Sequence, residues 1–125
     1  MPETTKQPTG EYPKPTPAQR IDLVETADRL VSGLAGKRRQ TQSLGREAGV
    51  SVIMMAMEGG DLLAEHSAKG TVTAHVLRGH VTLAAAGEAF DLRPGQLVMM
   101  QPGVRHDVRA EEQSVVLLTI DGGDE

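Results

Sequence analysis

The sequence predicts an all-β fold, a small barrel or sandwich, preceded by one short helix. After about position 37, short apolar and β-branched runs alternate with turns marked by glycine or proline, roughly every eight to twelve residues. The chain has 125 residues, enough for one domain with one sizeable core. Only 2% of the residues are aromatic, namely Tyr12 and Phe90, so the core must be aliphatic.

Composition excludes several classes of function. The net charge is -4 and aromatic stacking platforms are absent, so we expect no nucleic-acid partner and no anionic membrane surface. The basic run 37–39 is read as a solvated turn, with a phosphate patch as the alternative. The chain has no cysteine, which excludes disulfides, cysteine-based zinc sites and thiol nucleophiles. It shows no membrane span and no signal peptide, so we expect a soluble cytoplasmic protein.

The N-terminal part divides into two segments. Residues 1–18 hold five of the seven prolines and almost nothing apolar, which predicts a disordered tail, with a docking segment as the alternative. Residues 19–36 predict an amphipathic helix that ends at one of two glycines and packs outside the barrel or at a subunit interface. The apolar positions that recur at helical spacing are Ile21, Val24, Ala27, Leu30 and Val31.

Residues 37–121 predict the barrel, and residues 122–125 an acidic tail. Segment 50–57 is apolar on both faces, so we expect a central strand. Covering both of its faces needs the helix or a second subunit, and we expect a homodimer. Residues 45–49 are read as a turn. The expected strands are 38–44, 50–57, 62–66, 71–77, 81–85, 89–92, 96–100, 106–110 and 114–120.

Two stretches each place a histidine on or beside a strand, next to glycine-marked turns. His66 lies within the first, residues 60–79, and His106 ends the second, residues 93–106. In these residues the chain resembles the cupin superfamily, whose motifs are Gly-x5-His-x-His-x3–4-Glu-x6-Gly and Gly-x5-Pro-x-Gly-x2-His-x3-Asn. The positions that match are Gly60, His66, Gly79, Gly95, Gly103 and His106.

The chain departs from these motifs at four positions. Ala68 stands at the second histidine position and Val72 at the glutamate position. Gln101 replaces the proline, although a proline follows it, and Ala110 replaces the asparagine. In cupin metalloenzymes four side chains hold Fe, Mn, Ni, Zn or a similar ion. The resemblance therefore implies a jelly-roll barrel with two of four metal ligands, so that one weakly held divalent ion and no metal are both open.

The resemblance makes His66 and His106 the central candidates. It implies that both project into the barrel and face each other across a small cavity. They are candidate metal ligands, or a general acid/base and hydrogen-bonding pair for a small organic ligand. The plainer alternative is two residual histidines that hold water. His75 is a possible third ligand, but strand alternation turns it away from the interior if Val72 points inward.

Other residues carry weaker indications. Gln101 and Arg105 flank the second histidine and are candidate ligand-binding residues. Met55 and Met57 are candidates for a soft apolar ligand site, with gap filling in an aromatic-poor core as the alternative. Glu65 is read as a surface carboxylate and His80 as an exposed turn residue.

Three functions follow from these residues. The first is a small cupin protein that binds a small organic ligand and one divalent metal, with His66 and His106 as ligands or acid/base groups. The second is a non-catalytic small-molecule sensor without metal, which the losses at Ala68 and Val72 favour. The third is a structural or interaction role. The chain has neither a phosphate-binding loop nor a nucleophile elbow. The sequence leaves open whether the chain is an enzyme.

Overall fold

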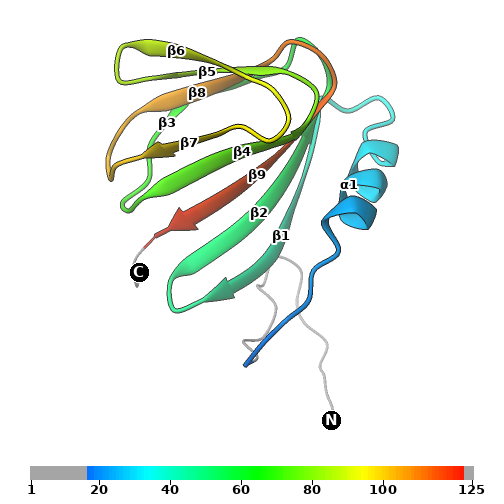
Figure 1. Cartoon of the computed structure of the whole chain (residues 1–125). Coiled ribbons are helices and arrows are strands. Elements are labelled where there is room, and N and C mark those ends of the chain that lie inside the picture. The colour runs from blue at the N-terminus through cyan, green and yellow to red at the C-terminus, as the bar shows by residue number, and fades with distance from the viewer. Residues whose placement is uncertain (1–16, 123–125) are drawn as a thin grey trace.

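The structure, a computed structural model, describes residues 17–122 and has two antiparallel β-sheets with one helix outside them (Figure 1). One sheet has the strand order β1-β2-β9-β4-β7, and the other β3-β8-β5-β6. Most of the predicted tail 1–18 and of the acidic tail 122–125 lies outside the described residues. The strands are β1 (Arg39–Glu47), β2 (Val50–Met57), β3 (Leu62–His66), β4 (Val72–Arg78), β5 (Val81–Ala85), β6 (Glu88–Leu92), β7 (Leu97–Met100), β8 (His106–Ala110) and β9 (Ser114–Asp121).

The predicted strands are all present, and the main difference is the end of β1. Residues 45–47, predicted as part of a turn, continue β1, because a bulge between Ser43 and Gly45 resets the pairing with β2. The turn itself is Ala48-Gly49, and both residues have positive φ. The strand segment 50–57 is central, since β2 pairs with β1 on one side and β9 on the other. β1 is an edge strand of its sheet.

The helix α1 (Leu23–Ser32) is shorter than the predicted 19–36 segment. Asp22 is its N-cap, because its side chain accepts a hydrogen bond from the backbone N–H of Glu25 at 3.0 Å. The expectation that the helix packs outside the barrel is confirmed. It lies beside β1 and β2 (Figure 1), and Arg78 of β4 forms an ion pair with its Asp28 at 2.9 Å. Within the described residues, no helix is long and apolar enough to cross a membrane.

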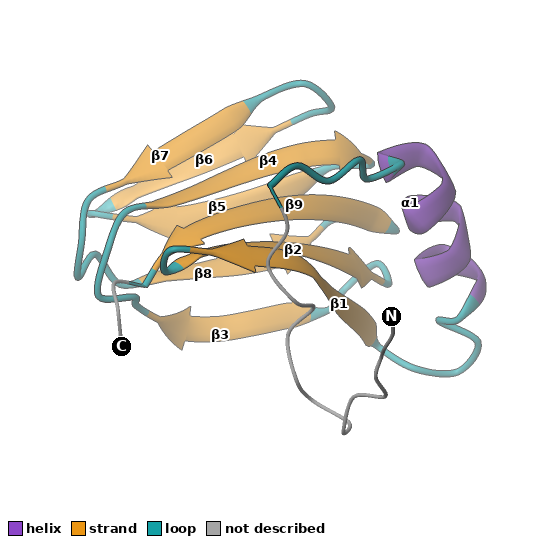
Figure 2. Cartoon of the chain, turned by 90° about the horizontal axis from the view of Figure 1, so that it is seen from below, coloured by secondary structure: helices purple, strands orange, loops and turns teal. Residues whose placement is uncertain are grey.

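Two apolar clusters hold the fold together, one on each face of the five-stranded sheet. The outer cluster joins α1 to the sheet through Ala27, Leu30, Leu34, Leu44, Met54, Ala56 and Val115. The helix therefore covers the outer face of β2, which the sequence left to the helix or to a second subunit. The inner cluster fills the space between the two stacked sheets (Figure 2). Its buried members are Met55, Met57, Val72, Ala74, Val76, Val81, Leu83, Ala85, Leu92, Val98, Met100, Val108, Ala110 and Val116.

The barrel is closed at one end and more open at the other. The open end is defined here by the loops 67–71 and 101–105, which are joined by a hydrogen bond from the Gly103 N–H to the Ala68 carbonyl at 2.9 Å. Along β9, the inward residue Val116 is 1% exposed, whereas Leu118 and Ile120 nearer the open end are partly exposed. Solvent therefore reaches the inner face of the barrel at the open end.

Candidate functional site

The two motif histidines occupy neighbouring strands at the open end. His66 ends β3 and His106 begins β8, and the two positions are direct register partners. Directly opposed residues of antiparallel strands have Cα atoms roughly 4.5–5.5 Å apart. The positions therefore lie side by side in one sheet, rather than facing each other across the barrel as the sequence suggested.

His106 is held on the inner face of the barrel. It shares the inward positions of β8 with Val108 and Ala110, which belong to the inner cluster, and it is 4% exposed. Its Nδ1 lies 3.1 Å from the carbonyl oxygen of Val104. A carbonyl only accepts hydrogen bonds, so Nδ1 carries the proton and donates it. In the neutral ring Nε2 is therefore an acceptor.

The other two positions that the resemblance assigns to metal ligands are part of the apolar core. Val72 is 3% exposed within the inner cluster, and Ala68 packs against it. Neither side chain has a donor atom. Across residues 17–122, as far as they are described, no group of three or more His, Asp or Glu side chains is placed to hold a metal ion. These residues do not fit the three or four protein ligands that a catalytic or structural metal centre of this kind needs.

The remaining predicted site residues do not gather around His106. His75 alternates with the inward Val72, Ala74 and Val76 on β4, so it lies on the outer side of the sheet. Met55 and Met57 lie in the inner cluster with 2% and 0% exposure, in the closed half of the barrel.

Gln101 and Arg105 are exposed on the loop at the open end. Arg105 lines a surface groove of about 350 Å³ together with the β5–β6 hairpin and Asp107. Asp107 alternates with the inward His106 and Val108, so this groove lies on the outer side of β8.

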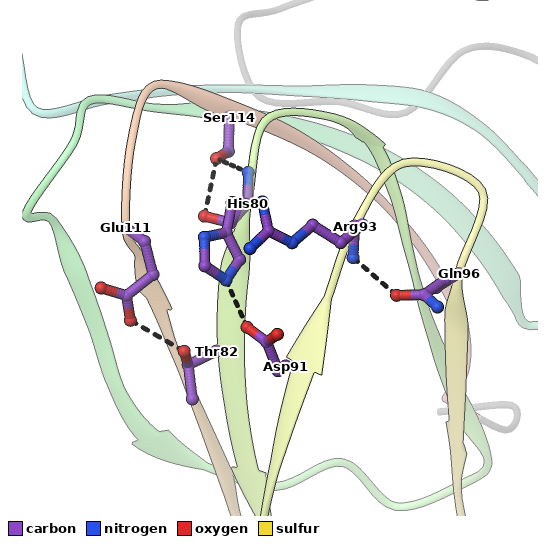
Figure 3. A network of polar contacts seen from close by, with 7 residues as sticks. All are labelled: His80, Thr82, Asp91, Arg93, Gln96, Glu111 and Ser114. Atoms are coloured by element: carbon purple, nitrogen blue, oxygen red, sulfur yellow. Dashed lines mark hydrogen bonds and ion pairs between the residues drawn. The ribbon is translucent and has the colours of Figure 1, made fainter.

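A separate network of polar contacts occupies the closed end of the barrel (Figure 3). The His80 Nε2 atom contacts the Asp91 carboxylate, so His80 is not the simple exposed turn residue that the sequence suggested. The hydrogen bond from His80, followed by the positive charges of His80 and Arg93, lowers the pKa of Asp91. Ser114 bonds only the backbone around His80 and Glu112, so Ser114, His80 and Asp91 do not form a nucleophile–base–acid relay.

A buried ion pair ties the two sheets together at the same end. Asp61, whose side chain is 0% exposed, accepts bonds from Nε and Nη2 of Arg39 at 2.8 and 3.1 Å. This bond with Asp61 raises the pKa of Arg39. Arg39 begins β1 and Asp61 immediately precedes β3. Because these strands belong to different sheets, the ion pair joins the two sheets along that flank of the barrel. The polar side chains of the closed end are thus engaged in holding loops and sheet edges.

Sequence reasoning missed one polar residue on the inner wall, Ser43. It pairs with Ile53, whose alternation with Met54 and Met55 places it on the inner face. The Ser43 hydroxyl oxygen is buried and has no hydrogen-bond partner. No motif contains this residue. Only the bulge beside it and the alternation of Leu44 to the outer cluster reveal its direction.

Comparison with known proteins identifies the family. Residues 53–121, more than half of the chain, match the cupin domain family. The chain belongs to the cupin family. The match begins within β2 and ends with β9, so it covers both motif histidines and most of the barrel. None of the curated proteins compared matches the chain.

Solved structures share the fold. A cupin superfamily protein from Desulfitobacterium hafniense is 16% identical with a TM-score of 0.64, covering 69% of this chain and 78% of that chain. KdgF from Halomonas sp. is 17% identical with a TM-score of 0.64, covering 70% and 82%. Salicylate 1,2-dioxygenase from Pseudoaminobacter salicylatoxidans is 16% identical with a TM-score of 0.70, and 78% of this chain matches 31% of that enzyme. Identities this low establish the jelly-roll fold alone.

Proposed function

We propose that this cupin domain binds a small organic molecule at the open end of its barrel, with His106 and the paired position His66 providing hydrogen bonds. The observation that carries the proposal is the partial exposure of inward Leu118 and Ile120 at the end that holds the buried His106. Inward apolar side chains that solvent reaches can bury a ligand's apolar body. The Nδ1–Val104 bond fixes the orientation of the His106 ring at this end of the barrel.

Binding without a resident catalytic metal is the version that the described residues favour. Ala68 and Val72 pack as apolar residues at the two positions where the resemblance places further ligands. No step of the proposed function therefore depends on a metal. A weakly held divalent ion is the second candidate, and the direct pairing of His66 with His106 is the observation in its favour.

Methionine methyl groups give a direct test. In protein labelled with ¹³C at the methionine methyls, Met100 reports on the inner face and the adjacent Met99, which is 69% exposed, on the outer face. A panel of alcohols, carboxylates and aromatics is titrated into the full chain. A bound ligand is expected to shift the Met100 signal and leave Met99 unchanged. His106→Gln is expected to weaken that shift, and the matched variant His75→Gln on the outer side of β4 to preserve it.

Ligands that shift only Met99, or an equal response in the two histidine variants, would contradict binding at the open end. Mass spectrometry of the incubated ligands separates binding from chemistry. Unchanged ligands support the sensor function, whereas turnover that disappears in His106→Gln would assign an acid/base role to the histidines.

The homodimer expected from the sequence also stays a proposal. Leu97 and Met99 on β7 are 51% and 69% exposed, and α1 packs elsewhere on the sheet. Light scattering with Met99→Glu as the variant tests it. A dimer mass that falls to the monomer mass in Met99→Glu would support an interface at β7.

A further inference from the structure

A row of paired residues crosses the inner face of the five-stranded sheet at the open end. Arg46 of β1 pairs with Ser51 of β2, and Ser51 pairs with Ile120 of β9. Ile120 pairs in turn with Val72 of β4, which pairs with Met100 of β7. Because neighbouring strands lie about 4.8 Å apart, these residues form one continuous row. The row begins with a cation and a hydroxyl and continues with three apolar side chains.

Strand alternation places Arg46 on the inner side of the sheet. Ser51 is 8% exposed, and the next residue, Val52, packs against the outer cluster, so Ser51 and its partner Arg46 face the interior. Arg46 is partly exposed. It also borders a groove on the outer face, because its neighbours Gly45 and Glu47 face that side. The register therefore brings a cationic side chain to the inner rim of the barrel.

The facing sheet makes the open end asymmetric. Its row at this level runs from the His66 position through His106 and Ala85 to Glu88. The edge strands β1 and β3 share one flank of the barrel, where the buried ion pair joins them at the closed end. Arg46 and the two histidine positions thus belong to the β1–β3 flank, whereas Glu88 lies on β6, the opposite edge of its sheet.

Two further cations lie on the loops of the open end. Lys69 belongs to the loop 67–71 and Arg105 to the loop 101–105, and both residues are exposed. Arg105 borders the groove on the outer side of β8 together with Asp107. These two charges favour the approach of an anion to this end, and Arg46 is the cation within the inner row.

We propose that Arg46 binds the carboxylate of an organic acid whose apolar body lies on Ile120 and Val72. The inference rests on the proposed function at the open end and names the class of ligand. The planar guanidinium of arginine can donate two parallel hydrogen bonds to a carboxylate. This bond compensates for the hydration that a carboxylate loses beside apolar side chains. The acidic residues next to the row in sequence, Glu47 and Asp121, alternate to the outer side of the sheet.

The test compares cyclohexanecarboxylate with cyclohexanecarboxamide, which have the same apolar body and nearly the same shape. The full chain is labelled with ¹³C at the δ-methyls of its isoleucines. Ile120 reports on the inner row and Ile21, which packs against the outer cluster, on the other face. The carboxylate is expected to shift Ile120 alone and to bind at least about tenfold more tightly than the carboxamide. Raising NaCl from about 20 to about 500 mM should weaken only the carboxylate.

Three variants assign the effect to Arg46. Arg46→Gln is expected to weaken carboxylate binding about tenfold and to leave carboxamide binding unchanged, which also shows that the variant is folded. Arg46→Lys should retain part of the preference for the carboxylate, because it keeps the charge and loses the two-pronged geometry. The matched control is Arg109→Gln, which removes an exposed arginine on the outer side of β8 and should leave both affinities unchanged.

Each contrary result has a defined meaning. Equal affinities for the two probes, or an unchanged carboxylate affinity in Arg46→Gln, would overturn the inference, while a shift of Ile120 would still support the proposed function. Loss of both probes in Arg46→Gln would show a structural role and overturn the inference. A loss confined to Lys69→Gln or Arg105→Gln would assign the anion to the loops and overturn it as well. If neither probe shifts Ile120, both the inference and the proposed function fail.

Discussion

His66 and His106 are directly paired across β3 and β8, although many residues separate them in the sequence. The pairing follows from the jelly-roll order, in which β8 lies between β3 and β5. A divalent ion between these two positions would need water for its remaining ligands. With Ala68 and Val72 supplying nothing further, such an ion would be held by two side chains at most.

A metal titration is expected to show weak binding that depends on this pair. Ni²⁺ at millimolar concentration should raise the midpoint of thermal unfolding, since a ligand that binds the folded state stabilises it. His106→Gln should abolish the rise, and His75→Gln, on the outer side of β4, should retain it. An equal rise in both variants would place the ion elsewhere on the chain.

The contact between His80 and Asp91 predicts a contribution to the free energy of unfolding that is lost in acid. The pKa of Asp91 is lowered in the folded state, first by the hydrogen bond from His80. A carboxylate of this kind stabilises the fold fully above its unfolded pKa, about 4, and the contribution disappears as the pH falls through the folded value. Urea unfolding of the wild type and Asp91→Asn should therefore differ at pH 6, and the difference should shrink as the pH falls through the lowered pKa of Asp91. A gap that persists at low pH would argue against this origin.

The buried Asp61 predicts a large cost when Arg39 is removed. Arg39→Met leaves a carboxylate with 0% exposure unpaired, and should destabilise the protein by about 2–4 kcal/mol. The added change Asp61→Asn should recover part of this loss, because the orphaned charge is gone. Arg109→Met, at an exposed arginine of β8, is the control and should cost less than about 0.5 kcal/mol. Chemical unfolding measures all three.

Gly79 is predicted to be irreplaceable for steric reasons. It has a φ of +85°, and a Cβ there would lie 2.3 Å from the Gln113 carbonyl oxygen and from the Ser114 hydroxyl. Gly79→Ala should cost about 3–4 kcal/mol, the sum of a left-handed backbone and a backbone clash. Gly87→Ala is matched in φ, at +79°, but meets no atom within 4 Å, and should cost only about 1 kcal/mol. Similar losses for the two variants would refute the steric explanation.

The β5–β6 hairpin predicts a stabilising substitution. Ala86 has a φ of 51° and is followed by Gly87 with a φ of 79°, the pattern of a turn that favours asparagine at its first position. Ala86→Asn should stabilise the protein by about 0.5–1 kcal/mol. Ala89→Asn, in the adjoining strand, should give no such gain, because asparagine is disfavoured in strands. A shift in the unfolding midpoint in urea distinguishes the two.

Most of the fold was predictable because its information is local. Alternation and turn residues located every strand, and Val72 lies inward on β4, so that His75 is turned outward as alternation required. The end of β1 was not predictable, since a bulge is set by the pairing between Ser43 and Gly45 and not by composition.

The site was less predictable because it depends on contacts between distant residues. The motifs identified His66 and His106, but their side-by-side pairing depends on which strands are neighbours. The contact of His80 with Asp91 and the orphaned hydroxyl of Ser43 depend on strand register and leave no pattern in the sequence. Such features emerge only when the sheets are assembled.

Met54 and Met55 are consecutive residues of β2, yet one lies under α1 and the other inside the barrel. Val115 and Val116 of β9 divide in the same way. A single sheet is thus the shared wall of two apolar compartments, and loosening either one disturbs the backbone of the other. Detachment of the helix should therefore be inseparable from melting of the barrel, so that the domain lacks any partly folded state that keeps a native interior.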